Sequence, residues 1–308
     1  MKNRKLSSIL FFSLLAAASM VYYGCSKDRI QTKTPLNNYN SPNNYLNSKE
    51  QAEQTFVIDT NGTGPIVGNQ GTNIWMGKSC LMYPNGDSVY FPFTVKLVEL
   101  YTPKDMIYYQ MPTVASDTIL ETAGEIRLRA FKNGTELLLR PGCSDAIKMP
   151  NSSPQNYMRV FYGFPASNYV NWTDNPATLG VTTAFTPQFT AGAGGYSAPI
   201  VKLGWINCDV KRGSGNNHVL TFASSTDNLT NVAIFVFFPV TKTVMQVYNL
   251  TSGSIPDGSS VKIVAIAVDG SGTLFSYNQN LTMTSSTQAQ VTMAATTDAA
   301  LTSLLNGL

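Results

Sequence analysis

Few side chains in this sequence have the types and spacing that chemistry requires. The one histidine, His218, lies in an Asn-rich stretch that offers neither a nucleophile nor an orienting carboxylate, so we interpret it as a turn residue. Zinc sites use closely spaced cysteine and histidine, whereas Cys80, Cys143 and Cys208 stand far apart in the chain. The sequence therefore predicts no metal site and no cofactor.

Carboxylates form a second set of candidates. Four glutamates in the first half of the chain could include a glycosidase-like acid pair: Glu99, Glu121, Glu125 and Glu136. The alternating pattern around Glu125 instead predicts a solvent-facing position beside Arg127 and Arg129. Asp257 and Asp269 each precede a glycine in a turn, where an aspartate bonds its own backbone, and they lack the spacing of a calcium loop. We therefore expect that the protein is not an enzyme.

The first 24 residues have the three parts of an export signal. Basic residues open the segment, an apolar run of about 13 residues follows, and Gly24 precedes Cys25. The run is too short for a spanning helix, which needs about 20 residues. A small residue before a cysteine is typical of bacterial lipoprotein signals. We therefore predict that residues 1–24 are a lipoprotein signal peptide and that Cys25 is lipidated; the alternative is an ordinary secretory signal with an incidental cysteine.

Charge excludes one class of partner. The net charge of +3 comes from Lys2, Arg4 and Lys5, which leaves 18 basic against 18 acidic residues from Cys25 onward. A neutral chain without a basic block has no electrostatic footprint for a phosphate backbone. We therefore expect no nucleic-acid partner.

Residues 25–54 are predicted to be a disordered tether. Asparagine is dense there and apolar residues are sparse, so the segment buries too little to offset the entropy of ordering it. Such a tether would hold a folded body away from a membrane.

Residues 55–173 are predicted to form a first β domain. Apolar residues alternate from Val89 to Leu97, as in a half-buried strand, and Thr102 followed by Pro103 predicts the start of a short helix. An Asn-Gly turn at residues 133–134 joins two further alternating segments and predicts a hairpin.

Residues 174–198 are predicted to be a linker, and residues 199–308 a second β-sandwich domain. The glycine-rich run at 191–195 lacks the Lys-Ser/Thr of a phosphate-binding loop. Strands then recur every 8–12 residues, the apolar run at 232–238 predicts a strand buried on both faces, and Thr297 begins a short helix. The expected fold class is all-β: two antiparallel β-sandwich domains with a short C-terminal helix, after a signal peptide and a flexible tether.

Two features of the predicted domains leave alternatives open. Aromatic residues are dense at 157–172, and the candidate ligand-binding side chains are Tyr157, Tyr162, Tyr169 and Trp172. They could pack between a strand and the domain junction, or stack on sugar rings. Beyond Cys25 an odd number of cysteines remains, so Cys80 and Cys143 could form a disulfide within one domain or stay buried thiols.

Several motifs carry a resemblance to a known family. In order along the chain they are Gly71-Thr72-Asn73-Ile74, Tyr83-Pro84-Asn85-Gly86, the segment from Val95 to Met106, Gly124-Glu125-Ile126, Val170-Asn171-Trp172 and the segment from Leu203 to Asp209. They resemble a module of Bacteroidota outer-membrane lipoproteins that is itself similar to the ZU5 β-sandwich. The resemblance implies a fold and a compartment, and ZU5-like modules usually serve as interaction domains.

Signal, composition and resemblance together define the expected function. We expect a lipid-anchored outer-membrane protein, on the periplasmic or the cell-surface face, that acts as a non-catalytic binding or structural module. Its expected partner is the membrane, through the lipid anchor, beside a protein or a glycan. The alternatives are a surface carbohydrate-binding lipoprotein of a glycan uptake system and a secreted hydrolase.

Overall fold

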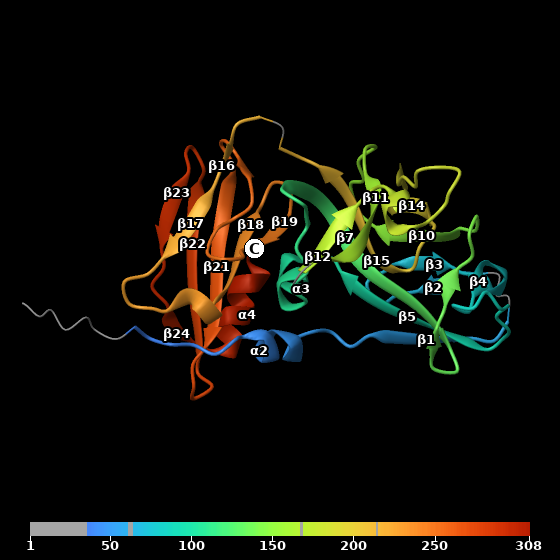
Figure 1. Ribbon diagram of the computed structural model, residues 1–308, viewed down its shortest axis with the longest axis horizontal. Helices are drawn as coiled ribbons and strands as arrows, with labels where there is room; N and C mark the ends of the chain where they lie inside the picture. The colour runs from blue at the N-terminus through green and yellow to red at the C-terminus, as the bar shows by residue number, and fades with distance from the viewer. Residues whose placement is uncertain (1–35, 61–63, 167–168, 214) are drawn as a thin grey trace, which may run out of the picture. The chain divides into compact units, whose positions relative to one another are not determined.

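The computed structural model describes residues 36–308 except 61–63, 167–168 and 214. The predicted signal peptide, Cys25 and the first part of the predicted tether lie outside the described residues. Residues 37–308 form one compact unit of mainly antiparallel sheets that ends in a short helix, so the all-β prediction is confirmed (Figure 1). Among the helices of the described residues, none is long and apolar enough to cross a membrane.

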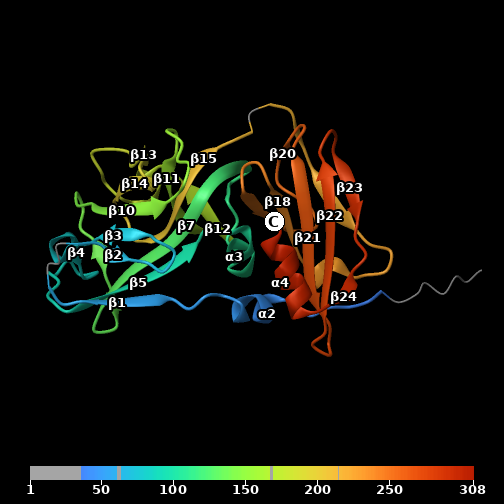
Figure 2. The same cartoon turned by 180° about the vertical axis from the view of Figure 1, so that it is seen from behind.

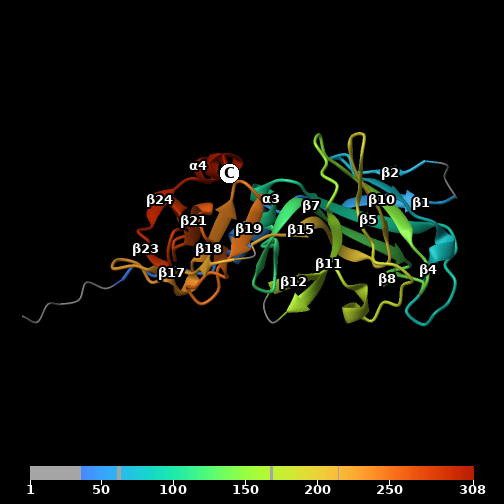
Figure 3. The same cartoon turned by 90° about the horizontal axis from the view of Figure 1, so that it is seen from above.

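The N-terminal β block is a sandwich of two antiparallel sheets. The larger sheet runs in the order β1-β5-β7-β15-β11-β12, and β6 and β8 also pair with β7. Its strands are β1 (Gln54–Ile58), β5 (Phe93–Leu100), β6 (Val114–Ala115), β7 (Thr118–Lys132), β8 (Thr135–Glu136), β11 (Arg159–Ala166), β12 (Tyr169–Thr173) and β15 (Gly204–Lys211). Figure 3 shows the long strand β7 between β5 and β15.

The facing sheet runs in the order β13-β14-β10-β3-β2, and a separate pair joins β4 to β9. The strands are β2 (Ile66–Val67), β3 (Asn73–Trp75), β4 (Leu81–Met82), β9 (Leu138–Leu139), β10 (Asp145–Pro150), β13 (Thr190–Gly192) and β14 (Gly195–Ile200). Short helices in this block are η1 (Lys78–Cys80), α3 (Pro103–Tyr108) and η2 (Pro176–Leu179). Alternate residues of the facing strands fill the space between the sheets, among them Leu97, Leu128 and Ile147.

The C-terminal β block is built on one antiparallel sheet with the order β19-β18-β21-β22-β24. Its strands are β18 (Ala233–Phe238), β19 (Thr243–Gln246), β21 (Ser260–Val268), β22 (Leu274–Thr282) and β24 (Ala294–Thr296). Two strand pairs, η3 and the last helix complete the block: antiparallel β16 (Asn217–His218) with β20 (Ile255–Pro256), parallel β17 (Leu220–Ala223) with β23 (Thr287–Gln290), η3 (Leu229–Asn231) and α4 (Asp298–Asn306).

The apolar run at 232–238 is buried on both faces, as its composition predicts. Ile234 and Val236 of β18 pack in the core shared with β17 and β23, whereas Phe235 and Phe237 belong to a cluster on the other face. We call this second group the helix cluster, because Leu46 of α2 (Asn43–Ser48) and buried residues of α3 and α4 contribute to it. Figure 2 shows these three helices near one another. The outer face of the larger N-terminal sheet completes the cluster.

Local signals at the helix ends and at the hairpin also appear as predicted. The side chain of Thr102 accepts a hydrogen bond from the Asp105 amide at 3.2 Å at the start of α3. Thr297 accepts one from the Ala300 amide at 3.2 Å at the start of α4. Asn133 and Gly134, both with positive φ, form the turn between β7 and β8.

The prediction of a disordered tether is wrong for its described part, which is docked on both β blocks. We call residues 37–58 the strap. Asn37 and Tyr39 donate hydrogen bonds to the buried Asp227 carboxylate at 3.1 and 2.6 Å, and Leu46 is 0% exposed in the helix cluster. Strand β1 then pairs with β5. Composition did not reveal this because the partners of the strap lie up to 253 residues away along the chain.

The predicted linker at 174–198 is also wrong, since it contains η2 and two strands of the N-terminal sandwich. Strand β14 pairs with β10 along six residues, and the glycine-rich run forms the turn between β13 and β14. A Cβ on Gly195 would lie 2.1 Å from the Met149 carbonyl oxygen, so glycine is required for β14 to approach β10. The glycines thus mark a close approach of two strands.

The boundary between the two β blocks consequently moves. Strand β15, predicted in the second domain, pairs with β7 and β11 of the first. Backbone hydrogen bonds also join the blocks: the amide of Thr113 donates to the carbonyl of Val244 at 2.8 Å, and that of Thr122 to Thr241 at 3.0 Å. These bonds, with the helix cluster, explain why residues 37–308 form one unit instead of two separable domains.

Docking of the strap should contribute to the free energy of unfolding. Leu46→Ala should lower the free energy of unfolding by roughly 3 kcal/mol, because it removes a fully buried side chain and leaves a cavity. Asn44→Ala, an exposed position in the same helix, is the control and should change stability by less than about 0.5 kcal/mol. Urea unfolding measures both, and equal stabilities for the two variants would show that α2 is not docked.

Candidate functional site

Two of the four predicted ligand-binding aromatics belong to the core. Tyr162 is 1% exposed and accepts a hydrogen bond from the Val201 amide at 3.0 Å. Trp172 is 3% exposed, lies in the helix cluster, and donates from Nε1 to the Pro112 carbonyl at 2.6 Å. The packing interpretation is correct for both residues, and neither presents a face for stacking.

The other two aromatics lie at the surface but in separate environments. Tyr157 is 44% exposed, and the Arg212 guanidinium lies 4.8 Å from its ring centre. Tyr169 is half-buried and its ring centre lies 5.3 Å from that of Tyr248 in the C-terminal block. The structure therefore does not bring the four rings together as one platform.

Glu125 was predicted to face solvent, but its side chain is fully buried. It pairs with Asn207 across β7 and β15, on the outer face of the larger sheet, and both residues and Asp209 are fully buried. The reason is that the helix cluster and its surroundings cover a sheet face that the alternating pattern assigned to water. No hydrogen-bond donor reaches the Glu125 carboxyl, so burial, reinforced by the Asp209 carboxyl, raises its pKa well above the usual value.

Asp209 is the second carboxyl of a buried acid pair, of which Glu125 is the first. Burial raises its pKa well above the usual value, and the side chains of Thr122 and Asn207 counteract part of that shift. Thr122 Oγ1 lies 3.1 Å from Asn207 Oδ1 on the same face. The pair is enclosed by protein, and within the described part of the chain no three or more metal-ligating side chains gather in one group. Because Glu125 and Asp209 are both 0% exposed, a molecule in solution has no path to either carboxyl in this structure.

The remaining candidates for acid chemistry are engaged in structural contacts. The Glu99 carboxylate accepts hydrogen bonds from the amides of Gln70 and Thr72 at 2.9 Å each. Glu121 pairs with Arg212 at 2.6 Å. His218 Nε2 lies 2.8 Å from the Asp257 carboxylate. In the turn after β21, the Asp269 carboxylate accepts hydrogen bonds from its own loop, as the turn interpretation predicts.

A concave site lies elsewhere, at one end of the N-terminal sandwich. We call it the Leu203 pocket, a cavity of about 430 Å³ formed by Met82 and three chain segments: 136–143, 179–182 and 201–204. Its apolar lining consists of Met82, Leu137, Leu138, Leu139, Leu179, Val181, Val201 and Leu203. Pockets of this size with mainly apolar walls are the usual binding sites for small organic molecules.

The acidic side chain at the Leu203 pocket has an ion-pair partner, whereas the basic ones have no carboxylate of the described residues within 4 Å. Glu136 is held by Arg129, whose Nε and Nη2 donate to the two carboxylate oxygens at 2.8 and 2.9 Å. This pairing lowers the pKa of Glu136. Lys202, in contrast, donates only to the Leu203 carbonyl, at 3.3 Å, and burial lowers the pKa of its ammonium. Across the described ranges, no carboxylate oxygen lies within 4 Å of Lys202 or Arg140.

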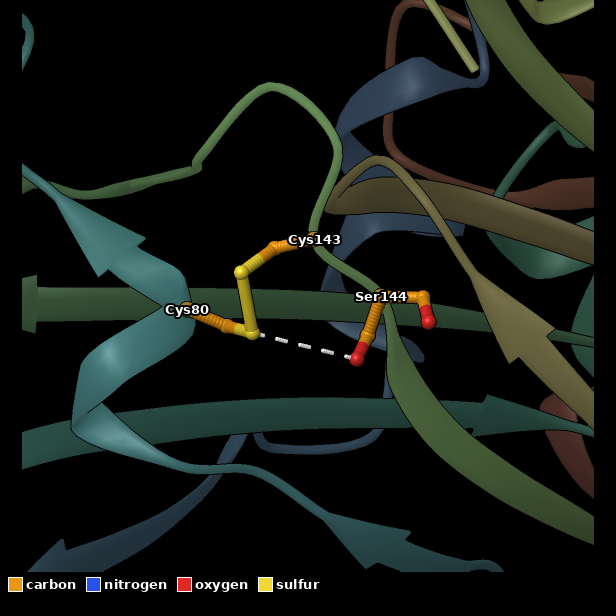
Figure 4. Close-up of a disulfide and its surroundings, with 3 residues drawn as sticks. All are labelled: Cys80, Cys143 and Ser144. Atoms are coloured by element: carbon orange, nitrogen blue, oxygen red, sulfur yellow. Dashed lines mark hydrogen bonds between the residues drawn. A yellow bond between two sulfur atoms is a disulfide. The ribbon is translucent and has the colours of Figure 1, made fainter. Parts of the chain in front are cut away.

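A disulfide supports one wall of the pocket. Cys80 and Cys143 are paired, with Cα atoms 5.4 Å apart, and they close a loop of 63 residues (Figure 4). The Arg140 amide donates to the Cys80 carbonyl at 2.8 Å, so the 140–143 segment is fixed at both ends. Cys208 is the buried free cysteine of the described residues. The disulfide interpretation, one of two left open by the sequence, is therefore the one the structure has.

The Leu203 pocket was not foreseen from the sequence. Its segments were divided among the first domain, the predicted linker and the predicted second domain. Each segment alone is a short apolar stretch next to a turn, which is typical of any sandwich core. A signal was present only in Lys202, a cation flanked by apolar residues at 200, 201 and 203.

Comparison with known proteins gives little further information. No family model and no curated protein matches the chain. A solved structure of a gamma-CGTase from alkalophilic Bacillus clarkii is 11% identical, and the match covers 77% of this chain and 40% of that enzyme at a TM-score of 0.18. This chain thus spans less than half of that enzyme, and a likeness at this TM-score carries no argument.

The raised pKa of the buried Asp145 carboxyl predicts a change of stability with pH. Burial raises its pKa to about 7, against the lowering effect of a hydrogen bond from the Gly77 amide. Between pH 4 and pH 7 the Asp145 carboxyl is protonated in the folded protein and ionised in the unfolded chain. Its contribution to stability is therefore complete below pH 4 and is lost as the pH rises to about 7.

We expect the free energy of unfolding to fall by roughly 2 kcal/mol more in the native protein than in Asp145→Asn between pH 5 and pH 7. Urea unfolding at the two pH values measures this difference. Asp59→Asn, at an exposed position, is the control and should keep the native pH dependence. Identical pH slopes in the native protein and Asp145→Asn would contradict the raised pKa.

Proposed function

We propose that this protein is a lipid-anchored outer-membrane protein that acts as a non-catalytic binding module and takes its ligand in the Leu203 pocket. The observation that carries the proposal is the pocket itself: apolar walls, about 430 Å³ of space, and cationic groups without carboxylate partners. The proposal also rests on the resemblance to Bacteroidota lipoproteins with a ZU5-like module, whose usual role is interaction.

Two observations support the location at the cell envelope. The Cys80–Cys143 disulfide is the chemistry of an oxidising compartment. Gly24-Cys25 after a short apolar run is the pattern of a lipoprotein signal. Because the docked strap begins at Asn37, the chain from Cys25 to Asn37 can span at most about 40 Å. The proposed anchor would therefore keep the body close to the membrane surface.

The side-chain chemistry supports a role without catalysis. Glu99, Glu121 and Glu136 are each held by hydrogen bonds or ion pairs, and Glu125 is enclosed. The glycan-binding alternative loses Tyr162 and Trp172 to the core, so we do not adopt it as the second candidate.

Lipidation is tested by substituting the acceptor. Cys25→Ala should release the protein into the soluble fraction or leave the precursor unprocessed, because two acyl chains anchor stably where one is marginal. Ser26→Ala, which keeps the cysteine, is the matched control and should fractionate with membranes. Membrane fractionation and intact-mass measurement give the result. A native protein without lipid mass would overturn the proposed anchor.

Binding at the pocket is tested with a neutral apolar dye. Nile red should bind the mature chain with a single site, and Leu138→Glu should weaken the binding at least tenfold by placing a charge in the pocket. Leu138 is 44% exposed, so the change does not disrupt the core. Val240→Glu, at an 86% exposed position outside the pocket, is the control. Dye binding that is absent, or equal in both variants, would overturn a binding role for this pocket.

A further inference from the structure

The charge and shape of the Leu203 pocket select one class of ligand. Resting on the proposed function, we infer that the pocket takes an amphipathic carboxylate, a molecule with an apolar chain or ring and one carboxylate, whose carboxylate pairs with Lys202. The inference combines the apolar walls with the half-buried, unpaired ammonium that lines them.

The electrostatic part of the argument begins with the one carboxylate of the lining, Glu136. Arg129 binds both of its oxygens, so Glu136 cannot also neutralise Lys202 by direct contact. Lys202 is left with one carbonyl, and Arg140 with a hydrogen bond from Nη2 to Ser88 Oγ at 3.1 Å. A partly desolvated ammonium gains more from a carboxylate than an exposed one does, because the local dielectric constant is low.

The apolar part of the argument excludes other small ligands. A small inorganic anion would pair with Lys202 but leave the leucine and valine walls in contact with water. A neutral lipid would cover Leu203 and Val181 but leave the ammonium unpaired. An amine would place like charges together. A ligand that joins an apolar body to a carboxylate satisfies both parts of the lining.

The wall of the pocket formed by residues 138–143 is held in place without a ligand. The Cys80–Cys143 disulfide and the β4–β9 pair fix residues 138–143 on the sandwich. A preorganised wall reduces the entropy that binding costs. The pocket therefore needs no large rearrangement to admit a short chain.

The test compares three ligands of equal chain length: decanoate, decanol and decylamine. Each is titrated calorimetrically into the mature chain, residues 25–308 with Cys25→Ser, and into three lysine variants of it. Decanoate should bind at least tenfold more tightly than decanol or decylamine. Lys202→Gln should weaken decanoate at least tenfold and leave decanol within twofold. Lys202→Arg should keep the preference for decanoate. Lys242→Gln removes the same charge at an exposed position and should change nothing.

The outcomes separate this inference from the proposed function. Equal binding of decanoate and decanol, or a preference for decanoate that survives Lys202→Gln, overturns the ligand class while pocket binding stands. Binding of Nile red without binding of any of the three ligands has the same meaning. Loss of Nile red binding as well overturns the proposed function itself.

Discussion

The structure depends on burial of the outer face of the larger N-terminal sheet. Phe161 and Trp172 on that face pack with α2, α3, α4 and the second face of the C-terminal sheet in the helix cluster. A sandwich sheet ordinarily leaves its outer face to water. Here that face is a second core, and three consequences follow: the β blocks form one unit, the strap has an apolar site to dock on, and Glu125 and Asp209 are held as raised-pKa acids inside the protein.

Features that depend on neighbours in sequence were predictable. Thr102 and Thr297 cap their helices, Asn133-Gly134 turns its hairpin, and the run at 232–238 is buried on both sides. In each case the physical cause lies within a few residues: a side-chain oxygen near free amides, a turn that needs positive φ, or a lack of polar side chains. Local chemistry was therefore sufficient for these elements and for the all-β class.

Features that depend on distant partners were not predictable. Asparagines of the strap looked like disorder, yet Asn37 bonds Asp227 across 190 residues, and Asn231 donates to the Tyr39 carbonyl. The glycines at 191–195 looked like a linker because their requirement, the approach of Gly195 to Met149, comes from another strand. The Leu203 pocket could not be predicted from the sequence for the same reason. Its three segments were assigned to three different regions of the chain and meet only in the folded structure.

The strap links the proposed anchor to the folded body. Its first residues bond the C-terminal block through Asp227, and its last residues form β1 of the N-terminal sandwich. Lys49 and Tyr45 also contact Asp298 of α4, the tyrosine at 2.8 Å. The pocket lies at neither attachment, because its lining comes from residues 136–143, 179–182 and 201–204. The proposed anchor and the proposed ligand site would thus use separate parts of one compact unit.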